Sequence, residues 1–435
     1  MTQANARTIG IDFGTTNSAI ALATPEGAVL ATFQDGDRQT TTFRSVLYFD
    51  PEELTPTRKP RATAGPEAIR NYVQAGTRGR LIQSLKSFLA SPRFGQTTIF
   101  GVRYTLEDLI ASVIRQLKEV AEAQFGTLSP HVVVGRPAHF SGAEDDAGDA
   151  RALQRLQTAI EQAGFTHVEF VLEPVAAAYQ YEQQLDHDEL VLIADFGGGT
   201  SDFSLIQLGP AARQRGQRSN DILGTDGVAL AGDTFDSRLV RHLVAPQLGC
   251  GSQYRSMFDK ILPVPAWLYE HLERWHYLSF LKTPKTLETL QQLCFQALEP
   301  QKIAALLHVV EADLGYALFQ AVEGAKCALS EQEASALGFD EPPAVLRAQV
   351  QREAFEGWIH RDIEAMALCI DRLLCRCGIA AGDVDSVFLT GGSSFVPAVR
   401  HVFEHRFGAA RLRGGEELTA VAKGLALHAL AEGAW

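Results

Sequence analysis

Two glycine-rich segments constrain the fold of this chain more strongly than any other feature of its sequence. The segments 12–22 (DFGTTNSAIAL) and 195–205 (DFGGGTSDFSL) share an Asp-Phe-Gly start, a serine and a final leucine. Each follows a short apolar stretch and precedes another, which predicts a strand, a tight turn and a second strand. The copies lie too far apart for a solenoid repeat, so they predict a chain built from two duplicated lobes.

The tips of the two predicted hairpins are rich in glycine and threonine. Bare backbone N–H groups and hydroxyls bind anions, phosphate above all, because no Cβ blocks the approach. A simple turn explains one such hairpin, but it does not explain a pair in which an apolar strand and an aspartate precede each tip. We therefore predict that two facing tips hold a polyphosphate. The residues concerned are Gly14, Thr15, Thr16 and Asn17 in the first copy and Gly197, Gly198, Gly199 and Thr200 in the second.

An aspartate opens each copy of the repeat, Asp12 in the first and Asp195 in the second. Mg²⁺ prefers hard oxygen ligands, keeps several of its waters and usually takes only one or two carboxylates. Asp12 and Asp195 therefore predict a hydrated Mg²⁺ beside the polyphosphate, bound through water.

Composition narrows the class of protein. The chain has 435 residues and a formal net charge of −13, which argues against nucleic acid or an anionic membrane surface as a partner. The start, MTQANARTIG, lacks the pattern of a signal peptide, and no run reaches the roughly 18–20 apolar residues of a membrane span. Six cysteines do not indicate a disulfide scaffold. We expect an acidic, globular, cytoplasmic protein.

Motifs along the whole chain resemble one family. The hairpins are similar to phosphate-binding motifs 1 and 2 of the actin, sugar-kinase and heat-shock-70 ATPase superfamily, and IGIDFGTTNSAIAL resembles the start of the heat-shock-70 (DnaK-like) chaperones. Five further segments follow in that family's order: VVVGRPAHF (132–140), LEPVAAAYQYE (172–182), AGDTFDSRLVRHLV (231–244), EGAKCALS (323–330) and VFLTGGSSFVPAVRHVFEHRFG (387–408). The resemblance implies an α/β, two-lobed actin-like ATPase fold of duplicated ribonuclease-H-like lobes with a nucleotide cleft between them.

The same resemblance implies a division into domains. ATPase lobe I is expected at 1–190 plus 415–435, with an outer insert at about 40–115. Lobe II is expected at 191–413, with an enlarged outer insert at about 234–360. The chain ends soon after a predicted closing helix, so we expect no peptide-binding domain, as in the truncated YegD-like chaperones.

The resemblance implies that ATP or ADP binds with Mg²⁺, and it assigns four catalytic positions. Lys86 takes the place of the lysine that reaches the γ-phosphate, and Glu173 takes the acidic place that orients water. Thr200 helps to orient the attacking water, and Asp195 acts beside the metal. Taken alone, Lys86 in LIQSLKSFL fits the exposed side of an amphipathic helix, and Glu173 fits a helix-capping acid.

A second group of residues would hold the nucleoside. The resemblance assigns this part to Gly232, Asp233, Glu323, Lys326, Ser330, Gly391, Gly392, Ser393 and Phe395. Two of these positions depart from the family pattern. The family's GGED is AGDT here, with Asp233 in place of the longer glutamate, and Phe395 stands where the family has an arginine that stacks on adenine. A phenylalanine also stacks, but it carries no charge for a cation–π interaction.

Three functions fit the sequence. We predict a chaperone-like, slowly hydrolysing ATPase; a nucleotide-gated scaffold without turnover and a small-molecule kinase of the same superfamily are the alternatives. The insert 234–360 contains a segment, 263–282, with large aromatic side chains at helical spacing. It predicts either the packed core of an enlarged subdomain or a surface for a client or co-chaperone protein.

Overall fold

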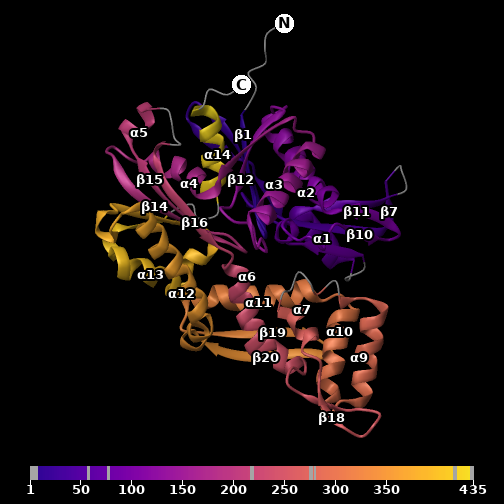
Figure 1. Ribbon diagram of the computed structural model, residues 1–435. Coiled ribbons are helices and arrows are strands. Elements are labelled where there is room, and N and C mark those ends of the chain that lie inside the picture. Colours follow the sequence, from indigo (N-terminus) through magenta and orange to yellow (C-terminus); the bar gives the residue numbers. More distant parts are fainter. Residues whose placement is uncertain are drawn as a thin grey trace. The chain divides into compact units, whose positions relative to one another are not determined.

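The computed structural model describes residues 8–55, 59–75, 79–215, 220–273, 278, 281–414 and 419–431. The chain divides into two compact units, which we call the first unit (Met1–Ala231 with Ile363–Trp435) and the second unit (Gly232–Asp362). Figure 1 shows the elements of both. The predicted lobe boundary near residue 190 stays a prediction.

The first glycine hairpin lies in the centre of a mixed sheet of the first unit. Its strands β1 and β2 are antiparallel, β2 also pairs with antiparallel β3, and β1 is followed on its other side by parallel β12 and β13. The strands of this order are β13 (His167–Leu172), β12 (His131–Arg136), β1 (Ile9–Phe13), β2 (Asn17–Thr24) and β3 (Gly27–Leu30).

The second glycine hairpin has the same surroundings in a second sheet of the first unit. Strands β14 and β15 are antiparallel, β15 pairs with antiparallel β16, and β14 is followed by parallel β21 and β22. Their bounds are β16 (Ile222–Val228), β15 (Ser201–Leu208), β14 (Glu189–Phe196), β21 (Ser386–Thr390) and β22 (Leu412–Gly414). Strand order and direction therefore repeat, and the predicted duplication is confirmed at the level of topology.

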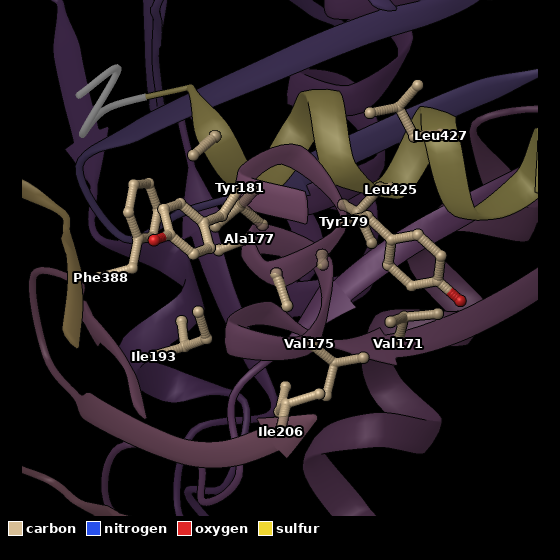
Figure 2. Packing of buried hydrophobic residues seen from close by; sticks show 14 of the residues in the cluster. Val171, Val175, Ala177, Tyr179, Tyr181, Ile193, Ile206, Phe388, Leu425 and Leu427 are labelled. Carbon is tan, nitrogen blue, oxygen red and sulfur yellow. The ribbon is translucent and has the colours of Figure 1, made fainter. Parts of the chain in front are cut away.

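Helices α4 (Glu173–Glu182) and α14 (Ala420–Ala431) form the core beside these sheets. Figure 2 shows Tyr179 of α4 close to Leu425 of α14, and Tyr181 of α4 beside Phe388 of β21, with ring centroids 5.0 Å apart. A Cβ at Gly424 would lie 1.7 Å from the Ala176 carbonyl oxygen, so the helices approach closely only because this residue is glycine. Both helices were predicted from the sequence.

The rest of the first unit surrounds this core. Helix α2 begins at a capping box in which Thr105 and Asp108 exchange side-chain to backbone hydrogen bonds of 3.1 and 2.8 Å. The other elements are β4 (Phe33–Asp35), β5 (Arg38–Thr40), β6 (Phe43–Arg44), β7 (Val46–Leu54), β8 (Pro60–Ala64), α1 (Gly65–Gln74), β9 (Arg80–Gln83), the 3₁₀ turn η1 (Leu85–Phe88), β10 (Gln96–Ile99), β11 (Val102–Thr105), α2 (Leu106–Phe125), α3 (Asp146–Gln162), α5 (Pro210–Arg215), the 3₁₀ turn η6 (Gly392–Phe395) and α13 (Pro397–Phe407).

The second unit is mainly helical. Helices α9 and α10 pack against each other, and α11 packs on the hairpin β19–β20 (Figure 1). The aromatic segment 263–282 contributes α7, which buries Tyr269, while 274–277 and 279–280 lie outside the described residues. The elements are α6 (Gly232–Leu239), β17 (Gln253–Arg255), β18 (Ile261–Pro263), α7 (Trp267–Glu273), α9 (Pro284–Gln296), α10 (Pro300–Glu311), α11 (Gly315–Glu331), β19 (Ala334–Glu341), β20 (Ala344–Gln351) and α12 (Arg352–Cys377), which continues into the first unit.

Within the described ranges, no single helix is long and apolar enough to span a membrane. Helices α10 and α11 pass this test only together, and the pair is bent by 108°.

Candidate functional site

A buried ion pair lies at the centre of the first unit. Lys86 Nζ donates to Glu173 Oε1 at 2.6 Å, and only 10% and 7% of the two side chains are exposed. The predicted amphipathic helix around Lys86 is wrong, because residues 80–83 form strand β9 and Lys86 lies in the turn η1. Lys86 is therefore not the surface lysine that the local pattern allows. Ser84, directly before this turn, has a left-handed backbone (φ 55°).

Three aspartates surround this ion pair from three strands. Asp12 lies in β1 and Asp195 in β14, while Asp202 lies in β15 directly opposite Asp195 in the register of the hairpin. Burial and the nearby Glu173 raise the pKa of Asp12 and of Asp202 to about 7. Burial, Glu173 and Asp12 raise the pKa of Asp195 well above its usual range. The site therefore holds more carboxyl groups than it can keep ionised without a cation.

Lys86 is the cation that faces these carboxyl groups within the described residues. Burial alone would lower its pKa, but the carboxylates of Glu173 and Asp12 outweigh burial and raise it. The ammonium therefore stays charged at neutral pH. One lysine compensates at most one of four carboxylates, so the negative charge in excess favours a bound cation.

Asp202 is a buried site residue that is not among the catalytic and binding residues predicted from the sequence. Its Oδ1 accepts a hydrogen bond of 2.6 Å from the Ala138 amide, which belongs to the loop after β12. Its Oδ2 is buried and has no hydrogen-bond partner among the described residues. A buried carboxylate oxygen without a partner is costly, so this atom points to a water or ligand that completes the site. The signal in the sequence was the second acid of DFGGGTSDF.

The two hairpin tips lie next to each other. A Cβ built on Gly199 would lie 3.3 Å from Ser141 Oγ and 4.0 Å from Thr15 Oγ1. The side chains of Thr15 and Thr200 are buried in this region. The structure therefore brings the predicted tips together, with Ser141 as a third contributor that the sequence did not reveal. Thr16 and Gly198 belong to the same two tips.

The glycines of the two tips differ in what requires them. At Gly14 a Cβ would lie 2.0 Å from the Asn17 carbonyl oxygen, so the hairpin itself excludes a side chain. At Gly197 a Cβ would lie 3.5 Å from the Thr200 carbonyl oxygen, which is ordinary contact, and the backbone is not left-handed. The described chain gives no steric reason for glycine at 197. The Asn17 side chain is held by Arg44 Nη1 at 3.2 Å.

In the second unit, α6 and α11 bring the predicted nucleoside residues together. Lys326 Nζ donates to Asp236 Oδ2 at 2.7 Å and to the Gly232 carbonyl at 3.4 Å. Burial, followed by the neighbouring Asp236, raises the pKa of Asp233 to about 7, against the effect of Lys326. Glu323 and Ser330 lie on α11 with Lys326 and are half-buried. Asp236 was not predicted, and its buried Oδ1 lacks a hydrogen-bond partner in the part of the chain that is described.

The remaining predicted residues follow β21 in the first unit. Gly391 has φ +84°, and a Cβ there would lie 2.0 Å from the Phe196 carbonyl oxygen, so the chain itself requires this glycine. Around Gly392 no described atom lies within 4 Å of the Cβ position. Ser393 is buried, whereas 54% of Phe395 is exposed. Phe395 therefore has a free face in the part of the chain that is described.

The acid cluster fits a hydrated magnesium ion better than a direct metal cage. Within the described residues, no three His, Cys, Asp or Glu side chains converge as metal ligands. Mg²⁺ commonly keeps most of its waters and takes one or two carboxylates. Asp12 and Asp195 with the unpartnered Asp202 Oδ2 supply negative charge and an acceptor for such waters.

Comparison with known proteins identifies the family. The family model described as Hsp70 protein matches residues 84–248 and 312–432. The chain belongs to the Hsp70 family. Together with the duplicated sheets, this membership confirms the α/β, two-lobed actin-like ATPase fold, and it supports a chaperone-like nucleotide-binding domain. Residues 249–311 lie between the two matched stretches.

Curated relatives that the chain matches include DnaK chaperones. The chaperone protein DnaK of Thermosipho africanus is 25% identical over 423 residues, which cover 97% of this chain and 58% of the relative. The chaperone protein DnaK of Halobacterium salinarum is 26% identical over 432 residues, which cover 98% of this chain and 56% of the relative. The chain thus spans less than two thirds of the length of these Hsp70 relatives.

Proposed function

We propose that this Hsp70-family chain binds ATP with Mg²⁺ at the two glycine hairpins and hydrolyses it slowly, as the switch of a chaperone-like protein. The observation that carries the proposal is the buried cluster of Lys86 with four carboxyl groups beside two adjacent hairpin tips. A cluster with this excess of negative charge is costly to bury without a function that uses it. Slow turnover is part of the proposal because the resemblance to the family implies it.

Each group has a part in phosphoryl transfer, which depends on positioning and electrostatics more than on covalent chemistry. The Lys86 ammonium stabilises negative charge that develops on the transferred phosphoryl group. Glu173 holds Lys86 in place and accepts a proton or hydrogen bond from the attacking water, which the Thr200 hydroxyl orients. Bound Mg²⁺ would supply charge neutralisation for the phosphates, and Asp12 and Asp195 would hold its waters.

We propose that the other residues predicted from the sequence bind the nucleoside of ATP. In the second unit, the resemblance gives a nucleoside role to Gly232, Asp233, Glu323, Lys326 and Ser330 of α6 and α11. In the first unit, it gives a nucleoside role to Gly392, Ser393 and Phe395 after β21. The pairing of Lys326 with Asp236 supports this part, because it fixes the ammonium in a buried, polar position.

Particular residues also support the two alternative functions, a scaffold without turnover and a small-molecule kinase. A nucleotide-gated scaffold without turnover is supported by the departures at Asp233 and Phe395. A small-molecule kinase needs a carboxylate base, and Asp202, with its pKa raised to about 7, supplies a candidate. A client or co-chaperone that binds through residues 234–360, a cytoplasmic location and a YegD-like place within the family also remain proposals.

One experiment separates these readings. Purified protein is titrated with Mg²⁺-ATP by calorimetry, and phosphate release is followed in parallel for the wild type and Thr200→Ala. The chaperone-type ATPase predicts binding in both proteins and slow release that falls at least about tenfold in the variant. Binding without release in the wild type indicates the scaffold, and release that rises on addition of a sugar indicates the kinase. No binding refutes all three.

A further inference from the structure

An exposed apolar surface lies on the second unit, away from the residues considered so far. We call it the hairpin surface; its residues are Met257, Phe258, Ile261 and Leu262 of the β17–β18 hairpin with Phe295 and Leu298 at the end of α9. Met257, Phe258 and Phe295 are 86%, 84% and 91% exposed. Large exposed apolar side chains mark interaction sites. Because Ile261 and Leu262 are consecutive strand residues, each face of the hairpin carries one of them.

The two parts of the hairpin surface are joined by backbone contacts. Leu298 N donates to the Gln253 carbonyl at 2.8 Å, and Tyr254 forms a β-bridge with Ala297. The end of α9 therefore covers the outer edge of β17. The outer edge of β18 has no such cover in the described chain, since β18 pairs only with β17.

The register shows which backbone groups this edge presents. Ser256 N donates to the Lys260 carbonyl at 2.8 Å and Val264 N to the Ser252 carbonyl at 3.0 Å, so the even-numbered pairs carry the hydrogen bonds inside the hairpin. In an antiparallel ladder the pairs between them point outward. Ile261 therefore presents its N–H and C=O to the outside, and Pro263 presents its C=O. An unpaired edge strand with apolar side chains is a template for another strand.

A second copy of the chain fits this edge poorly. If two β18 strands paired antiparallel around Ile261, the Pro263 carbonyl of one copy would face Asp259 of the other. The Asp259 N–H already donates to the Ser256 carbonyl at 3.0 Å, so it has no hydrogen for a partner. In an extended segment without such a constraint, every second residue points its N–H toward the edge of β18. These N–H groups donate to the carbonyls of both Ile261 and Pro263.

The charges near the tip favour an apolar segment over a charged one. Arg255 Nη1 and Asp259 Oδ1 pair at 2.5 Å, and Lys302 Nζ pairs with Glu299 Oε1 at 2.5 Å. These side chains neutralise each other, so the exposed Lys260 adds one positive charge at the tip, and the apolar residues provide the main contact. The hairpin surface lies within residues 249–311, between the stretches that the Hsp70 family model matches, so membership of the family does not account for it.

We propose that the free edge of β18 binds an extended apolar segment of another polypeptide as an antiparallel third strand, with its side chains on the hairpin surface. The segment would donate to the carbonyls of Ile261 and Pro263 and accept from the Ile261 N–H. This binding is independent of the proposed nucleotide function, and its test uses no nucleotide.

The test titrates the full chain into a fluorescein-labelled peptide of alternating valine and threonine and follows fluorescence anisotropy. Ile261→Pro removes the outward N–H together with part of the apolar side chain of Ile261, and it costs the hairpin no hydrogen bond, because the amide of Ile261 takes no part in the hairpin. Phe258→Ser removes an apolar contact at a tip position that is 84% exposed, so its fold is safe. Leu368→Ser on α12 is the matched control, since Leu368 is 66% exposed and lies outside the hairpin surface.

Saturable binding that Ile261→Pro and Phe258→Ser each weaken about fivefold or more, the loss of roughly one net hydrogen bond or contact, supports the proposal, provided that Leu368→Ser binds as the wild type does. Absence of wild-type binding overturns it. Binding that Ile261→Pro leaves unchanged, with Phe258→Ser weakened, shows adhesion without strand pairing and also overturns it. A wild-type dimer in sedimentation that Ile261→Pro converts to monomer assigns the edge to a second copy instead.

Discussion

Alanine at Gly197 separates a glycine that a ligand requires from one that the fold requires. The new methyl group would lie 3.5 Å from the Thr200 carbonyl oxygen and 3.7 Å from Thr200 Oγ1, so it meets no clash within the described chain. The backbone is not left-handed, and alanine restricts the unfolded chain more than glycine. We expect the free energy of unfolding to stay equal or to rise by about 0.4–1 kcal/mol.

The same methyl group occupies the space beside the Thr200 hydroxyl, where the proposed function places phosphate oxygens. We expect the affinity for Mg²⁺-ATP to fall at least about tenfold, or roughly 1.4 kcal/mol. Gly391→Ala is the control, because φ of +84° and a Cβ 2.0 Å from the Phe196 carbonyl oxygen impose strain and a backbone shift. Its expected cost is about 2–5 kcal/mol of stability.

The assay combines urea unfolding with calorimetric titration of Mg²⁺-ATP for the wild type and both variants. A folded Gly197→Ala that binds ATP with wild-type affinity would remove the phosphate role of this glycine. A Gly391→Ala variant as stable as the wild type would show that a carbonyl oxygen 2.0 Å from the Cβ position does not make a glycine necessary here, and it would also remove the basis for the prediction at Gly197.

Three further substitutions test other parts of the first unit. Lys86→Ala should slow single-turnover ATP hydrolysis by the equivalent of about 2–4 kcal/mol, because it removes the charge that faces the phosphoryl group; an unchanged rate would make Lys86 purely structural. Asp226 accepts two 2.8 Å hydrogen bonds from Arg372, which is half exposed, so Asp226→Asn should lower stability in urea by about 1–3 kcal/mol; equal midpoints would contradict this. The hydrogen bond from His428 lowers the pKa of Glu169 against the effect of burial, so its stabilisation is complete above pH 4.5 and is lost as pH falls through the lowered value. Urea midpoints at pH 7, 5 and 3 should therefore fall less steeply for Glu169→Gln than for the wild type, and parallel slopes would refute the assignment.

The sequence predicted the elements whose signals are local. Both glycine hairpins and the helix that begins at Glu173 form where the apolar stretches, the glycines and the proline after Glu173 indicate. Topology was accessible through the repeat, because two similar hairpins need similar neighbours. The resemblance to one family carried the remaining order of motifs.

The environment of Lys86 was not accessible from the local pattern. The segment around it has helical periodicity, yet residues 80–83 pair with residues 46–49 of β7, and this long-range pairing overrides the local preference. The left-handed Ser84 then turns the chain so that Lys86 meets Glu173. Neither the pairing partner nor the left-handed residue leaves a mark within the segment itself.

The sequence alone does not show why a given position is glycine. The sequence does not distinguish the glycines of the predicted site from one another. The fold itself requires Gly14 and Gly391, because a Cβ at either position would lie 2.0 Å from a carbonyl oxygen of the chain. Gly197 and Gly392 meet no such obstacle among the described atoms. Where the fold itself requires glycine, the residue says nothing about a ligand. A phosphate or a nucleoside explains a glycine only at a position where the fold would also accept alanine. The structure therefore limits the candidate positions for close ligand contact to those where an alanine variant is expected to fold normally but to bind the ligand weakly.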